Sequence, residues 1–200
     1  MKFTLLTLIG LSLVIVSCHK SNTGGGSSAQ LVGTYKFLYL SAQTQSVSQV
    51  TGGGQNEKTV TNTNYKTTQN TGTVTFTADS LASKGVGYSA NTTSTTYIYD
   101  NGILSDSIPL PFSFSYPASN STTKYDVIGQ DSLFFHGGYL AMGLSGSSTV
   151  APPSGGRFSF KGDTLFLTSK VQQTNPPQTS GGITSTATAS GVAIIALLKQ

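Results

Sequence analysis

The sequence predicts an all-β fold, and three observations carry this prediction. Apolar and hydroxyl residues alternate in short runs, as in residues 73–77, 112–116 and 158–161, which is the period-2 pattern of half-buried strands. The chain contains 9 Tyr and 10 Phe together with many Thr residues, and these residue types suit a pleated surface. After residue 18 no segment shows the apolar spacing of three and four that an amphipathic helix requires. Short strands at close spacing favour an antiparallel up-and-down β-barrel, with a β-sandwich as the alternative.

The expected strands follow one another with little chain between them. We expect them at residues 31–41, 59–68, 72–81, 85–90, 95–99, 111–116, 123–128, 132–135, 139–144, 156–161, 164–171 and 191–199. Residues rich in Gly, Asn and Asp predict turns between them at 100–102, 129–131, 136–138 and 161–163. The last segment is apolar on both faces at residues 192–198, so it should be a central strand that closes the fold.

Three stretches predict long loops instead. Residues 41–56 are rich in Gln, Ser and Gly, while residues 145–155 and 172–182 each contain a Pro-Pro pair. Loops of this length are either functional or disordered. Their low-complexity composition favours disorder.

One internal repeat supports an antiparallel design. Residues 131–135 (DSLFF) are echoed by residues 163–167 (DTLFL), and each run is preceded by a strand and a turn. Both copies predict a β-hairpin in which the Asp caps the turn and the Leu starts the returning strand.

The N-terminus is typical of an exported protein. Lys2 precedes an apolar stretch from residue 5 to residue 16, which is the pattern of a secretory signal peptide and is too short to span a bilayer. The stretch ends in Ile15-Val16-Ser17 directly before Cys18, the one cysteine of the chain. This segment resembles a bacterial lipoprotein lipobox, which implies cleavage before Cys18 and attachment of acyl chains such as palmitate to that residue. Several acyl chains would hold the mature protein firmly on a lipid bilayer.

The chain therefore divides into three parts. Residues 1–17 are the predicted signal peptide, residues 18–30 the acylated cysteine and a Gly/Ser-rich tether, and residues 31–200 one β domain. Ten tether residues reach about 20 Å, so the domain should lie close to its membrane. No second cysteine is present for a disulfide, so burial alone must hold the core.

Composition argues against nucleic-acid binding. Only 9% of the residues are charged, and although the net charge is +4, the lysines are scattered along the sequence and Arg157 is the one arginine. A phosphate-binding face needs clustered Lys and Arg. The partner that the sequence indicates is the bilayer, through Cys18, and it indicates no particular protein partner.

The domain resembles the lipocalin-like lipoproteins of Bacteroidetes. The resemblance rests on the first strand (LVGTYKF, residues 31–37), the hairpins with Gly-Asp-Thr-Leu-type turns and the final apolar strand ending in Lys199. The Gly-x-Trp hallmark of lipocalins is represented by Gly33-Thr34-Tyr35. The resemblance implies an eight-stranded barrel that holds one small hydrophobic ligand or is filled by its own side chains. The inward residues, and hence the candidate ligand contacts, would include Phe37, Phe76, Tyr97, Phe112, Phe114, Phe158 and Phe160.

Catalytic chemistry is poorly represented. His19 lies in the tether and His136 at a Gly-Gly turn, and most carboxylates lie at turns. Asp126 and Asp131 are the pair that best approaches the two carboxylates of a glycosidase. No cluster of His and Cys suits zinc, and no Asp-rich loop suits calcium. We therefore expect no enzyme activity, no metal and no cofactor.

A recurring tripeptide of Asp, then Ser or Thr, then an aliphatic residue resembles the O-glycosylation motif of exported Bacteroidetes proteins. The candidate acceptors are Ser80, Ser107, Ser132 and Thr164. A β-turn that leads into a strand produces the same three residues without any sugar, so both explanations stay open.

Taken together, these patterns predict a membrane-tethered envelope lipoprotein whose β-barrel binds a small apolar ligand or has a non-catalytic accessory role. The alternative is a β-sandwich that serves as a structural, protein-interaction or glycan-binding module, for which Tyr97, Tyr99 and Tyr139 would be exposed platforms. Residues 19–22 (HKSN) lack the acidic run that resembles a surface-export signal in Bacteroidetes lipoproteins. We therefore expect the periplasmic face of the outer membrane.

Overall fold

The computed structural model describes residues 28–137 and 154–200 and confirms the all-β fold. One short helix, α1 (Ser28–Leu31), precedes nine strands. The strands are β1 (Gly33–Gly52), β2 (Gln55–Lys66), β3 (Thr68–Phe76), β4 (Ser80–Asp100), β5 (Ile103–Ile128), β6 (Ser132–Phe135), β7 (Ser154–Lys161), β8 (Thr164–Ser180) and β9 (Ile183–Lys199). Within the described part of the chain, no helix is long and apolar enough to cross a membrane.

The strands form one antiparallel sheet that closes on itself, as the barrel prediction requires. From β3 to β9 each strand pairs with the next in sequence, and β9 pairs with β1. Strands β2 and β3 share one position in this ring, because β2 pairs with one half of β1 and β4 while β3 pairs with the other half. The ring therefore has an up-and-down, barrel-like order, and residues 28–137 and 154–200 form no second, facing sheet.

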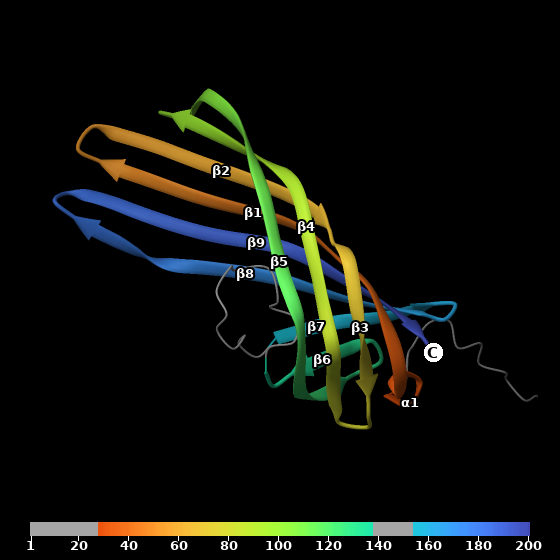
Figure 1. Ribbon diagram of the computed structural model, residues 1–200. Helices are drawn as coiled ribbons and strands as arrows, with labels where there is room; N and C mark the ends of the chain where they lie inside the picture. The colour runs from red at the N-terminus through yellow and green to blue at the C-terminus, as the bar shows by residue number, and fades with distance from the viewer. Residues whose placement is uncertain (1–27, 138–153) are drawn as a thin grey trace, which may run out of the picture.

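Unequal strand lengths divide the ring into two regions (Figure 1). β6 has 4 residues and β7 has 8, whereas β1 has 20, β4 has 21 and β5 has 26. Among the described strands, the ring is complete only where β6 and β7 lie, a region that we name the closed base. The long strands continue past it as a six-stranded layer, the open sheet, which consists of residues 41–52, 55–66, 91–100, 103–111, 169–180 and 183–193.

The closed base is filled by aromatic and aliphatic side chains. Phe76 is 1% exposed and lies edge-on to both Tyr35 and Tyr125, with ring centroids 5.7 Å apart in each pair. Leu31 of α1 is fully buried, and the carbonyl of Leu31 accepts a hydrogen bond from the Tyr35 hydroxyl at 2.9 Å. Each such buried side chain contributes about 1.5–3 kcal/mol, so this region carries most of the hydrophobic stabilisation.

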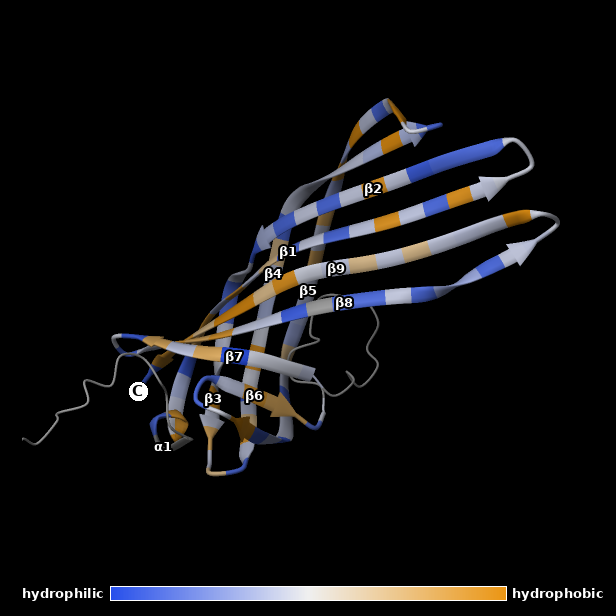
Figure 2. Ribbon diagram, turned by 180° about the vertical axis from the view of Figure 1, so that it is seen from behind, coloured by the Kyte–Doolittle hydropathy of each residue, from blue (hydrophilic) through white to orange (hydrophobic). Residues whose placement is uncertain are grey.

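The open sheet is polar on much of its length (Figure 2), and it corrects two of the predicted loops. Residues 41–56 and 172–182 are not disordered loops but the β1–β2 and β8–β9 hairpins. Both turns are two-residue Gly-Gly turns, Gly53-Gly54 and Gly181-Gly182, with positive φ at each residue, as type I′ hairpin turns require. Because the flanking residues are polar on both faces, they give no apolar alternation for a sequence reading to detect.

Other local predictions are confirmed. The turns at 129–131 and 161–163 and both hairpins of the internal repeat are present. Residues 85–90 and 95–99, expected as two strands, are parts of the single strand β4, and residues 111–116 and 123–128, also expected as two, are parts of β5, so this division was wrong. The expected strand at 139–144, most of the loop at 145–155, the signal peptide and Cys18 lie outside the described residues.

The two edges of the open sheet carry most of the prolines. Among the described residues, 103–123 of β5 and 169–180 of β8 have a paired strand on one side only. Five of the seven prolines lie on these edges, at positions 109, 111, 117, 176 and 177. A proline fits an edge strand where its nitrogen faces away from the neighbouring strand, because it has no N–H to donate. Where the nitrogen faces the open side, the proline offers no N–H to an added strand, and Pro176-Pro177 also interrupts the ladder between Asn175 and Gln178.

Candidate functional site

Six of the seven aromatic residues expected inside the barrel lie in the buried core or pack against it. Phe37, Phe76 and Phe158 are buried in the core, and Phe112, Phe114 and Phe160 are partly buried against it. Phe112 and Phe114 have ring centroids 5.7 Å apart, and the rings of Phe158 and Phe160 lie 6.4 Å apart. Their contacts are those of a filled core, which is one of the two states that the barrel resemblance implied.

Tyr97 is the exception, and the expectation that it points inward is wrong. Side chains alternate between the faces of a strand, and the buried neighbours Ser94 and Thr96 take the inward positions of β4. Tyr97 therefore lies on the opposite face, where its partners across the sheet are Val60 and Ser107.

The four candidate glycosylation residues lie at strand starts or on an edge. Ser80, Ser132 and Thr164 are the first residues of β4, β6 and β8, and Ser107 lies on the exposed part of β5. The Asp131 carboxylate accepts a hydrogen bond from the Ser132 hydroxyl at 3.0 Å, which is the behaviour of a turn cap. In the same way the Asp106 carboxylate accepts the backbone N–H of Ser107 at 2.7 Å.

The clearest hollow that the described residues form lies on the inner face of the open sheet. We use inner face for the side continuous with the buried interior, and outer face for the opposite side. One row of the inner face runs Thr61, Ser46, Ala189, Gln173 across β2, β1, β9 and β8, and the next row runs Thr59, Ser48, Ala187, Asn175. The hollow above these rows has a volume of about 330 Å³.

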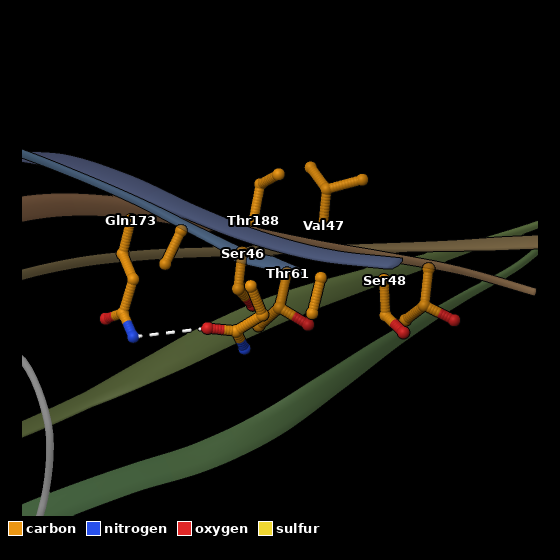
Figure 3. Close-up of a pocket in the computed structure, with 10 residues that line it drawn as sticks. Ser46, Val47, Ser48, Thr61, Gln173 and Thr188 are labelled. Atoms are coloured by element: carbon orange, nitrogen blue, oxygen red, sulfur yellow. Dashed lines mark hydrogen bonds between the residues drawn. The ribbon is translucent and has the colours of Figure 1, made fainter. Parts of the chain in front are cut away.

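The lining of this hollow is uncharged and combines polar side chains with apolar surface. Its hydroxyls come from β1 and β2, and two amides of β8 lie at one end. The small side chains of two alanines of β9 leave the space between them open. Gln173 donates a hydrogen bond to the Asn175 amide oxygen at 3.3 Å. Figure 3 shows Ser46, Thr61 and Gln173 pointing to one side of the sheet, while Val47 and Thr188 point to the other. The hollow thus offers hydrogen-bond donors and acceptors and an apolar floor, but no ionised group.

Hydroxyl pairs hold the wall of the hollow in place. The hydroxyls of Thr61 and Thr96 lie 2.9 Å apart, and those of Thr63 and Ser94 lie 2.7 Å apart in a buried position. Buried hydroxyls need such partners, since an unsatisfied one costs about 1–3 kcal/mol. The paired hydroxyls tie β2 to β4 and fix the surface next to the hollow.

Toward the closed base, the inner face ends in tyrosines that stay neutral. Tyr65 is 4% exposed and lies 5.6 Å from the Phe112 ring and 5.4 Å from the Phe114 ring. Burial raises the pKa of Tyr65 to about 12. Burial, together with the neighbouring Tyr65 and Tyr116, also raises the pKa of Tyr88. No phenolate therefore forms beside the hollow at neutral pH.

The carboxylates considered for catalysis have separate partners on the surface. The Asp126 carboxylate lies 2.7 Å from Nε2 of His136, and both side chains are more than half exposed. The Asp131 carboxylate lies 3.8 Å from the Arg157 guanidinium. In the described ranges, no group of three or more His, Cys, Asp and Glu residues is placed to hold a metal ion.

The hollow was missed from the sequence because half of its residues fall in the two segments that were expected to be loops, and its alanines lie before the expected last strand. A signal does exist at these positions. Ser46 and Ser48, and again Ala187 and Ala189, are small residues at period 2, and each pair lies within hairpin range of a Gly-Gly turn.

Comparison with known proteins gave no match. No protein-family model, curated protein or solved structure matches this chain.

Proposed function

We propose that this chain is an exported, lipid-anchored and non-catalytic binding protein of the cell envelope, of the lipocalin-like lipoprotein kind that its sequence resembles. The lipobox-like Ile15-Val16-Ser17-Cys18 run supports the anchor. The barrel-like ring supports the family resemblance at the level of fold alone. The outer membrane, on its periplasmic face, is the location that the residues after Cys18 favour.

The ligand that the inner hollow fits best is a small, neutral and hydroxyl-rich molecule such as a mono- or disaccharide. One observation carries this proposal: a hollow of about 330 Å³ is lined by hydroxyls, alanines, amides and one valine, without a charged residue. Ligand pockets of this kind measure about 300–1,000 Å³ and use a few placed polar groups for specificity. An apolar ligand inside the closed base is less favoured, because the aromatic side chains that would contact it contact one another instead.

The placement of α1 supports a binding role for the open sheet. The helix lies at the end of the closed base, and the hairpin tips of the open sheet lie at the far end of the molecule (Figure 1). A chain anchored through Cys18 would therefore hold the closed base toward the bilayer and the hollow away from it. In that orientation a soluble ligand reaches the inner face without crossing the membrane surface.

Titration with sugars tests the ligand proposal. The full mature protein, held in detergent, would be titrated by calorimetry with a panel of neutral mono- and disaccharides. Ala189→Leu places a larger side chain in the hollow and should weaken binding at least tenfold. Thr186→Leu is the control and should leave binding unchanged, because Thr186 alternates with the inward Ala187, so it lies on the outer face, and it does not line the hollow. Binding that survives Ala189→Leu, or a fatty acid that binds while every sugar fails, would contradict the proposal.

Cell fractionation tests the anchor. Cys18→Ser removes the thiol that would be acylated, so the protein should move from the membrane fraction to a soluble fraction. A protein that stays with the membrane after this change is held by something other than acyl chains on Cys18.

A further inference from the structure

The outer face of the open sheet carries a row of polar side chains that crosses five neighbouring strands in register. The row consists of Thr95, Asn62, Gln45, Ser190 and Gln172, each paired with the next across β4, β2, β1, β9 and β8. Neighbouring strands lie about 4.8 Å apart, so the row is about 20 Å long. Gln45 donates a hydrogen bond to the Asn62 amide oxygen at 3.0 Å, which fixes two of its members.

A second row lies directly beside the first. It contains Asn64, Gln43, Val192 and Lys170 on β2, β1, β9 and β8, and Thr93 of β4 extends it. The two rows line one shallow hollow of about 720 Å³, twice the volume of the inner one. The outer hollow therefore presents five amides, three hydroxyls and one lysine, arranged in two rows that cross the strands.

Charge is divided between the two faces of the open sheet. Its lysines, Lys58, Lys66 and Lys170, all lie on the outer face, while its acids, Glu57, Asp100 and Asp106, all lie on the inner face near the hairpin tips. The Lys66 ammonium lies 3.9 Å from the centre of the Tyr39 ring, and the Lys58 ammonium lies 5.8 Å from the Tyr99 ring. The outer face is thus positive, with two of its cations held against aromatic rings.

We propose that the outer face of the open sheet is a second binding surface, which takes a linear polysaccharide bearing carboxylate groups. Amide side chains offer both donors and acceptors to sugar hydroxyls, and lysines form charge-assisted hydrogen bonds with carboxylates. The line of polar groups, about 20 Å long, suits an extended chain lying across the strands better than a compact ligand. Three lysines among amides are too few for a phosphate-binding face, so the chemistry favours a sugar acid polymer over a nucleic acid.

Affinity electrophoresis of the full mature protein in gels that contain polygalacturonate tests this proposal. The wild-type protein should be retarded, and less so in gels that contain dextran, a neutral polymer. Lys170→Gln should weaken retention about threefold, as expected for one exposed charge contact, and combining it with Gln45→Ala should weaken it further. Lys84→Gln is the matched control, because Lys84 is an exposed lysine of β4 that pairs with Thr73 in the closed base.

Each outcome decides between specific alternatives. Retention that is lost equally in Lys84→Gln and Lys170→Gln, or equal retention by single-stranded DNA, would show simple ion exchange and overturn the proposal. An unretarded wild-type protein would overturn it as well. Ala189→Leu, which fills the inner hollow, should leave retention unchanged, so failure of the outer surface is distinguishable from failure of the sugar site on the inner face.

Discussion

The closed base and the open sheet share β1, β4, β5, β8 and β9 yet are stabilised differently. In the closed base, side chains such as Phe76 and Leu165 are at most 1% exposed and pack into one apolar cluster. In the open sheet, cross-strand hydroxyl and amide pairs such as Thr63–Ser94 and Gln45–Asn62 replace that cluster. Because burial in the closed base supplies most of the hydrophobic stabilisation, the open sheet does not need an apolar face. That region is then available for polar ligands.

The largest expected effect is a loss of packing in the closed base. Phe76→Ala removes a ring that contacts Tyr35 and Tyr125 and should lower the free energy of unfolding by about 3–5 kcal/mol, because a cavity remains. Thr61→Ala in the open sheet removes one hydroxyl pair and should cost only about 0.5–1.5 kcal/mol. Urea denaturation measures both. Equal losses of unfolding free energy would show that the two regions are not stabilised differently. Phe76→Leu is a milder variant to use if Phe76→Ala does not fold.

The same distinction explains what the sequence predicted and what it did not. The alternation around Val74 and Phe76 predicted a strand with the correct inward face, because the interior there is apolar. Leu165 and its repeat partner Leu133 likewise marked two hairpins. Ser46 and Ala189 line a face open to solvent, so no apolar pattern distinguished their strands from loops. Hydrophobic periodicity reports burial, and it gives no signal where a sheet is held by its backbone ladder and polar pairs.

Alkaline pH should lower the stability of the fold through its buried tyrosines. Burial raises the pKa of Tyr35, Tyr65, Tyr88 and Tyr125, that of Tyr65 to about 12, whereas an unfolded chain ionises its tyrosines near 10. The folded state thus binds more protons above pH 10. The stability from these tyrosines is therefore complete below pH 10 and is lost as the pH rises through their raised pKa values, about 12 for Tyr65. Urea midpoints should fall between pH 9 and pH 11.5.

A variant isolates the tyrosine contribution to that pH dependence. Tyr65→Phe should show a smaller fall in urea midpoint between pH 9 and pH 11.5 than the wild-type protein, whatever its stability at pH 9. Absorbance of the phenolate should rise together with unfolding. A midpoint that stays constant over this range, or an equal fall in Tyr65→Phe, would show that these tyrosines are accessible in the folded state.

The smallest expected change in stability, about 1 kcal/mol or less, concerns the β5 edge. Pro109 and Pro111 pair with Thr95 and Thr93 in a continuous ladder, so their nitrogens should face the unpaired side. Pro109→Thr with Pro111→Thr restores two N–H groups on an edge that also exposes Ile108 and Leu110, and such an edge invites strand addition. Sedimentation should show concentration-dependent self-association of this variant, whereas Ser113→Thr, which keeps its N–H, should remain like the wild type. If the proline variant shows no self-association, something other than the prolines protects the edge. The polar faces of the open sheet would then be what prevents strand addition.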